Sequence, residues 1–165
     1  MQYQSVVLTG KGYPDFATRE MLRFLSSASP CNGFNSPPVY GLVDFDPDGI
    51  GILSVYKHGS ANPAPEVESL TVPGIRRMGL HSSHVRAIES QGHTQGLLQL
   101  TGRDRRKARS MLQRPLFAEN GLQDDWRSEL QTMLMLNVKA ELQILDETPD
   151  ALANLLRDTV AEQYM

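Results

Sequence analysis

The stretch of sequence that decides the fold is residues 39–50, VYGLVDFDPDGI, in which an apolar run ends in a cluster of aspartates. Side chains alternate between the two faces of a strand, so Asp44 and Asp46 should point to the same side. Two such carboxylates supply part of an oxygen shell for Mg²⁺, which water and substrate phosphates complete. The stretch therefore predicts a magnesium site, and the alternative is a solvated Asp-rich turn.

The residues around this run predict an α/β fold. Pro47 and Gly49 indicate a turn after the strand, and the apolar residues 50–56 indicate a buried helix behind it. Strand, acidic loop and helix form half of a parallel α/β unit, whose ligands collect beyond the carboxyl ends of the strands. The chain has 165 residues, 40% of them hydrophobic, which suits a single domain with a helical appendage.

Other segments fit the same architecture. The apolar patterns, caps and turn residues place the expected elements along the chain. We expect residues 1–100 to form the α/β core and residues 101–165 a helical part packed on the same domain. The expected strands are residues 5–9 and 75–80, and the expected helices are residues 16–27 capped by Asp15, 84–89, 101–114, 126–145 and a terminal helix beginning at Thr148-Pro149-Asp150.

Several classes of protein are excluded by composition. No run of about 18 apolar residues exists and the N-terminus lacks a signal-peptide pattern, so we expect no membrane association. Cys31 is the only cysteine, which excludes an internal disulfide and a cysteine-rich zinc site. His81 and His84 stand at helical spacing without partner ligands, so a role at a helix start or on the surface is expected.

Positive charge is concentrated in residues 101–114, which hold six basic side chains and one acidic side chain. The segment begins with a Thr-x-x-Asp capping signal at Thr101 and predicts a basic helix that ends before Pro115. Its cations are candidates for neutralising DNA phosphates. The alternative is a solvated helix face paired with residues 115–165, which hold three basic and ten acidic side chains. The candidate DNA-binding residues on this helix are Arg103, Arg105, Arg106 and Lys107.

These features leave three functional hypotheses open. The first is magnesium-dependent work on nucleic acid. The second is a phosphohydrolase of the haloacid-dehalogenase type, whose D-x-D also follows a strand, although residues 47–50 lack the threonine that such a motif requires. The third is an inactive interaction module that keeps the fold without its chemistry.

A resemblance to a known family extends over roughly residues 5–145. The K-G-Y-P-D-x-A-T-R and D-x-D-P-x-G blocks at their observed separation resemble the Toprim domain of the eukaryotic meiotic double-strand-break endonucleases. That family is similar to the A subunit of archaeal topoisomerase VI. The blocks that carry the resemblance are VLTGKGYPDFATR at 7–19, YGLVDFDPDG at 40–49, VYKHGS at 55–60, MGL at 78–80, LTGRD at 100–104, MLQRP at 111–115, WRSEL at 126–130 and KAELQ at 139–143.

The resemblance implies a Toprim fold, which is a Rossmann-like, mostly parallel sheet flanked by helices, here with a helical C-terminal extension. It implies that Asp44 and Asp46 are the D-x-D pair that holds Mg²⁺ near the DNA backbone, where the cation stabilises charge on the phosphate. It also implies a DNA transesterase that makes meiotic double-strand breaks. The implied setting is a homodimer with B-subunit-like and other break-forming proteins, on chromosomes in the nucleus.

The resemblance assigns phosphate contacts to Lys11 and Arg19, for which a salt bridge to the acidic cluster is the alternative. The third acidic residue of the family site and its tyrosine nucleophile are expected outside these residues, in an earlier strand and an N-terminal winged-helix domain. Tyr13 and Tyr56 match Toprim positions and receive no catalytic role. Asp48 stands where the family commonly has a non-acidic residue, so we expect it in a solvated turn, and the alternative is that it replaces the missing metal ligand. This chain alone is thus expected to bind metal weakly and not to cleave DNA.

Overall fold

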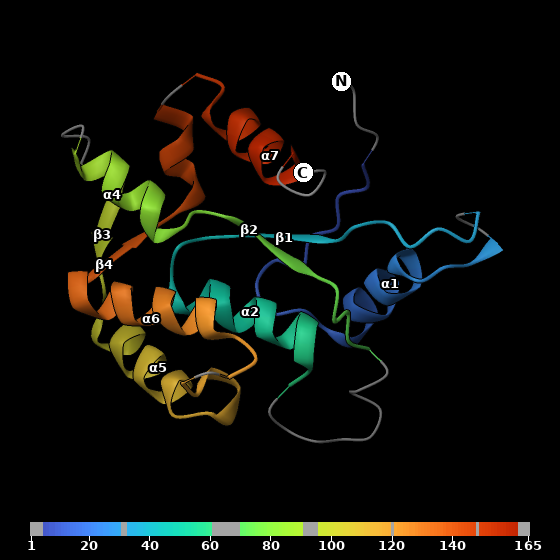
Figure 1. The fold of residues 1–165 in the computed structure, drawn as a ribbon, viewed down its shortest axis with the longest axis horizontal. Coiled ribbons are helices and arrows are strands. Elements are labelled where there is room, and N and C mark those ends of the chain that lie inside the picture. The colour runs from blue at the N-terminus through green and yellow to red at the C-terminus, as the bar shows by residue number, and fades with distance from the viewer. Residues whose placement is uncertain are drawn as a thin grey trace. The chain divides into compact units, whose positions relative to one another are not determined.

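The computed structural model (Figure 1) divides into two compact units. One unit comprises residues 1–41 and 51–76, and the other comprises residues 42–50 and 77–165. Cys31 and Thr148 lie outside the described residues. No helix in the described part is long and apolar enough to cross a membrane. The described residues are 5–30, 33–60, 70–90, 96–119, 121–147 and 149–161.

One pair of strands, β1 (Tyr40–Val43) and β2 (Arg76–Gly79), forms a parallel two-stranded sheet flanked by helices. The strands approach closely at Gly79, whose φ is +128° and where an added Cβ would collide with the carbonyl oxygen of Val43. Only glycine combines this backbone conformation with so close an approach. The predicted α/β class with parallel strands and a helical C-terminal extension is confirmed. The division of the chain at residue 100 stays a prediction.

Helix α2 (Pro47–His58) begins earlier than the sequence indicated. The prediction of a turn at Pro47 and Gly49, with the helix starting near Ile50, was wrong. The Asp46 carboxylate accepts a hydrogen bond from the N–H of Gly49 at 2.6 Å and so caps the helix. Proline is well suited to the first helical position, because an N–H there has no partner within the helix. The aspartate cluster therefore lies at the N-terminus of a helix.

A second sheet, which the sequence did not reveal, pairs β3 (Leu97–Gln99) with β4 (Val138–Ala140). The strands are antiparallel, with Leu97 opposite Ala140. Ala140 also forms a bridge to Phe45, in which the two backbone N···O distances are 2.9 and 3.0 Å. This bridge attaches β4 to the residue between Asp44 and Asp46.

Helix α6 (Asp124–Leu136) is shorter than the predicted helix over residues 126–145. It ends at Asn137, which adopts a left-handed conformation with φ of 53°. Asparagine tolerates this conformation better than most residues, and it commonly terminates helices. The apolar pattern does not stop there, because it continues into β4 and the 3₁₀ helix η3 (Leu142–Glu147). An apolar stripe alone did not distinguish these three elements.

Two further helices begin where their capping signals predicted. Asp15 caps α1 (Phe16–Ser26), and Thr101 with Asp104 forms a capping box on α5 (Gly102–Leu112), as predicted. Helix α5 packs on α6 (Figure 1). The other described helices are α4 (Ser82–Ser90), the 3₁₀ helix η2 (Pro115–Phe117) and α7 (Ala151–Ala161).

Two predictions, one near each end of the chain, were wrong. Residues 5–9 are not a strand in the structure: Val6 and Val7 are exposed, and no described segment pairs with them. A β-branched run becomes a strand only when a neighbour supplies its hydrogen bonds. The terminal helix begins at Ala151 and not at Pro149, because Asp150 has a positive φ of 62° and its carbonyl accepts the N–H of Asn154.

Candidate metal and DNA-binding site

Asp44 and Asp46 are each held by a backbone hydrogen bond to one carboxylate oxygen. Oδ1 of Asp44 accepts from the N–H of Leu142 at 2.8 Å, where η3 begins. Oδ1 of Asp46 accepts from the N–H of Gly49. Each bond fixes one oxygen and leaves the other oxygen of the carboxylate available to a cation. The pair is therefore oriented before any ligand binds.

Negative charge at Asp46 is not fully compensated by the protein. Burial raises the pKa of Asp46 above its ordinary value, and the charges of Asp44 and Asp48 raise it further. The N–H of Gly49 and the charge of Lys139 act in the opposite direction without cancelling the rise. A bound cation would favour the ionised form and relieve this repulsion.

The available donors fit Mg²⁺ as a partial shell. Within the part of the chain that the structure describes, no group of three or more His, Cys, Asp or Glu side chains is arranged to hold a metal ion. Magnesium is commonly bound through one or two carboxylates, with water and phosphate oxygens completing its octahedron. Asp44 and Asp46 would hold the ion, and the ion would supply positive charge next to a phosphate.

Asp48 has different partners from its two neighbours. Its carboxylate pairs with Nζ of Lys107 and lies 3.7 Å from Nη2 of Arg103, both on α5. The Asp48 and Lys107 side chains are 27% and 23% exposed, so this pair is partly shielded, whereas Arg103 is 76% exposed. The solvated turn expected at Asp48 is in fact the first turn of a helix with an ion pair.

Lys139 is a cation beside the aspartates that sequence reasoning missed. Its Nζ lies 3.0 Å from Oδ2 of Asp104, and this bond raises the pKa of Lys139, to which Asp46 and Glu141 also contribute. Burial opposes ionisation of Asp104, but hydrogen bonds from Thr101 and Lys139 outweigh it and lower the pKa. Lys139 belongs to the KAELQ block, which was the only signal for it in the sequence.

The predicted DNA-binding residues of α5 fall into three environments. Arg103 and Lys107 lie at Asp48, and Arg106 is exposed. Arg105 is engaged in the fold, because its Nη1 donates to the carbonyl of Leu100 at 2.6 Å and to Oδ1 of Asn137 at 2.9 Å. DNA contact by this helix stays a prediction. Arg105 is its weakest candidate, because these hydrogen bonds already engage its guanidinium.

Lys11 and Arg19 belong to the other compact unit. Lys11 is exposed and has a positive φ of 49°, while Arg19 is buried on α1. Within that unit burial raises the pKa of Tyr56, with the charge of Asp15 adding to the rise and that of Arg19 opposing it. The assignment of Lys11 and Arg19 to phosphate contact stays a prediction.

A second buried charge cluster joins β2 and α4 to α6. Arg77 Nη1 lies 3.5 Å from Oε2 of Glu129, and the same carboxylate accepts hydrogen bonds from the backbone N–H and the hydroxyl of Ser82, each at 3.0 Å. His81, whose Nδ1 lies 3.9 Å from Oε1 of Glu129, precedes α4 and donates its N–H to Nδ1 of His84. These two histidines thus lie at a helix start, as expected.

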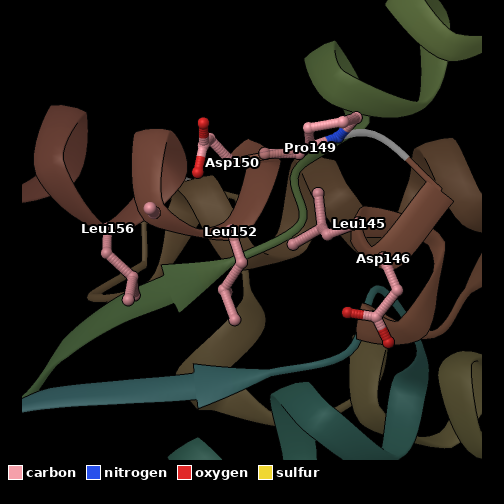
Figure 2. Close-up of a pocket in the computed structure, with 8 residues that line it drawn as sticks. Leu145, Asp146, Pro149, Asp150, Leu152 and Leu156 are labelled. Atoms are coloured by element: carbon pink, nitrogen blue, oxygen red, sulfur yellow. The ribbon is translucent and has the colours of Figure 1, made fainter.

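A hollow near the C-terminus is lined by residues distant in sequence from Asp44 and Asp46 (Figure 2). It has a volume of about 410 Å³ and lies between η3 and α7. None of the residues predicted to bind metal or DNA lines it. The labelled lining residues are Leu145, Asp146, Pro149, Asp150, Leu152 and Leu156.

Curated relatives are similar in sequence to most of this chain. It is 40% identical over 140 residues to the meiotic recombination protein SPO11-1 of Oryza sativa and 38% identical to SPO11 of Homo sapiens. It is also 35% identical to the A3 subunit of DNA topoisomerase 6 from Oryza sativa. These alignments cover 85–87% of this chain but 30–34% of the relatives, so the chain spans about a third of their length.

A family model for the Toprim domain of Spo11 and of the topoisomerase 6 A subunit matches residues 1–163. The resemblance inferred from the sequence blocks is thereby confirmed, and the match favours this family over the haloacid-dehalogenase-type alternative. Toprim domains of this family generally bind Mg²⁺. The chain belongs to the Toprim domain family of Spo11 and the topoisomerase 6 A subunit.

Proposed function

We propose that this chain is the Mg²⁺-binding and DNA-binding part of a protein that makes meiotic DNA double-strand breaks by transesterification. The observation that carries the proposal is the arrangement of Asp44 and Asp46, each oriented by a backbone N–H, with a raised pKa at Asp46. Family membership and the similarity to meiotic recombination proteins support the meiotic role. Cleavage is proposed for the whole protein, because the chain spans about a third of its relatives.

In this proposal the residues of the chain bind and position DNA. Asp44 and Asp46 hold the cation, whose charge offsets the charge that develops on a phosphate during strand cleavage. Arg106 and Arg103 are exposed on α5 and would contact phosphates of the DNA backbone. No tyrosine of the chain is assigned as the nucleophile. The proposed setting is a homodimer with a B-subunit-like partner on chromosomes in the nucleus.

Isothermal titration with Mg²⁺ tests the metal site. The unaltered chain should show a saturable heat of binding, and Asp44→Asn should remove most of that heat because an amide is a poor ligand for a hard cation. Asp48→Asn should keep it, since the Asp48 carboxylate pairs with Lys107 and Arg103. Asp158→Asn, an exposed site on α7, is the matched control for charge. Identical traces for the unaltered chain and Asp44→Asn would remove the metal assignment.

A further inference from the structure

Asp48 is the feature of the site that the proposed function does not use. Asp44 and Asp46 accept hydrogen bonds from backbone N–H groups, whereas Asp48 is bound by two cationic side chains of α5. Lys107 and Arg103 are side chains of the kind that bind phosphate, and a carboxylate offers them similar charge and oxygen geometry. Asp48 thus occupies the place that a phosphate would take beside these two cations.

The Asp48 carboxylate also has a source of stabilisation that does not depend on α5. It lies in the first turn of α2, where the helix dipole favours negative charge. Release of Lys107 and Arg103 would therefore not leave an isolated charge in an apolar environment. Because the side chain is partly exposed, water can also solvate it after release.

We propose that Asp48 competes with DNA phosphate for Lys107 and Arg103, so that it weakens DNA binding by this domain. The inference rests on the proposed function, since it concerns DNA at the same site. When DNA binds, a backbone phosphate replaces Asp48 as the partner of the two cations, and Asp48 stays at the N-terminus of α2. The competition lowers affinity for any phosphate backbone, irrespective of base sequence.

The expected size of the effect follows from the exposure of the two ion pairs. One pair is partly shielded and the other has an exposed arginine, so each contributes little, and breaking both costs a small part of the binding free energy. Removing the Asp48 charge should therefore tighten DNA binding by about threefold to tenfold. Two cations become available to phosphate in this variant. The slope of the logarithm of affinity against the logarithm of salt concentration should therefore become more negative by about one to two.

Fluorescence anisotropy with a labelled duplex, in EDTA and over a range of salt, tests the proposal. Four proteins are compared: the unaltered chain, Asp48→Asn, Asp158→Asn, and Asp48→Asn combined with Lys107→Gln. Asp48→Asn should bind more tightly and with a steeper salt dependence. Asp158→Asn makes the same change of net charge on α7 and should change affinity less than about twofold. The double variant should return close to the affinity of the unaltered chain.

The outcomes separate the inference from the proposed function. Equal affinities for Asp48→Asn and Asp158→Asn would overturn the competition, and so would tighter binding that persists in the double variant. Absence of DNA binding by all four proteins at low salt would overturn the proposed function itself. Asp48→Ser, which suits a helix N-terminus, repeats the measurement if circular dichroism shows that Asp48→Asn loses helix.

Discussion

The aspartates at residues 44–48 and the Arg77–Glu129 cluster both place carboxylates in partly buried surroundings, with opposite electrostatic results. Burial opposes ionisation of Glu129, but His81, Arg77 and Ser82 outweigh it and lower its pKa to about 2. At Asp46 burial and two neighbouring carboxylates raise the pKa. A carboxylate whose charge the fold satisfies serves the fold, and one whose charge remains unmet is suited to a ligand.

The largest effect should come from removing the carboxylate of the satisfied cluster. Glu129→Gln leaves the Arg77 guanidinium, whose side chain is 4% exposed, without its anionic partner. We expect a loss of about 3 kcal/mol in the free energy of unfolding, because the remaining charge is buried and uncompensated. Urea denaturation followed by circular dichroism measures it. Glu119→Gln, at an exposed position, is the control, and an equal small loss in both variants would contradict the structural role.

Acid should affect the same cluster with a defined sign. The pKa of Glu129 is lowered from 4.5 to about 2, so the folded state favours the ionised form. Its contribution is complete above pH 4.5 and is lost as the pH falls from about 4.5 toward 2. After allowance for solvent screening, this loss is on the order of 2 kcal/mol.

The pH test compares urea denaturation of the unaltered chain with that of Glu129→Gln between pH 6 and about 2. The difference in unfolding free energy between the two proteins should shrink across the window. Asp104, whose pKa is also lowered, affects the pH dependence of stability in both proteins. Its effect therefore largely cancels in the difference between their unfolding free energies. A difference that is constant with pH would show that Glu129 is not the titrating group.

The smallest effect on stability, and of opposite sign, should follow substitution in the unsatisfied cluster. Asp46→Asn keeps a side chain that caps α2 and removes one of three neighbouring negative charges. We expect the free energy of unfolding at neutral pH to rise by less than about 1 kcal/mol, while Mg²⁺ binding is lost. Paired urea denaturation and magnesium titration measure the two effects. A clear loss of stability would show that Asp46 serves the fold in the way that Glu129 does.

Local signals in the sequence predicted much of this arrangement. The apolar run placed Asp44 and Asp46 just after a strand, which ends at Val43, and capping residues identified the starts of α1 and α5. The start of α2 was missed because Pro47 suits both a turn and a first helical turn. The choice between those two depends on the bond from Gly49 to Asp46, which the sequence pattern does not specify.

Long-range pairing accounts for the remaining failures. Strand β4 looked like the end of a helix, because its apolar residues continue the stripe of α6. Lys139 was missed with it, since its position beside Asp104 depends on where β4 runs. For the basic helix, the sequence left phosphate contact and ion pairing both open. The structure pairs Lys107 and Arg103 with Asp48, which lies outside the acidic C-terminal segment that the charge pattern suggested.

The hydrogen bond from Leu142 to Asp44 joins residues 98 positions apart, and the Phe45–Ala140 bridge spans a similar interval. Contacts of such high sequence separation form slowly, because the intervening chain must first lose its freedom. During synthesis Asp44 leaves the ribosome long before Leu142, whose N–H orients it. The metal site is thus completed late, and a nascent chain lacking β4 would carry the D-x-D motif without the frame that positions it.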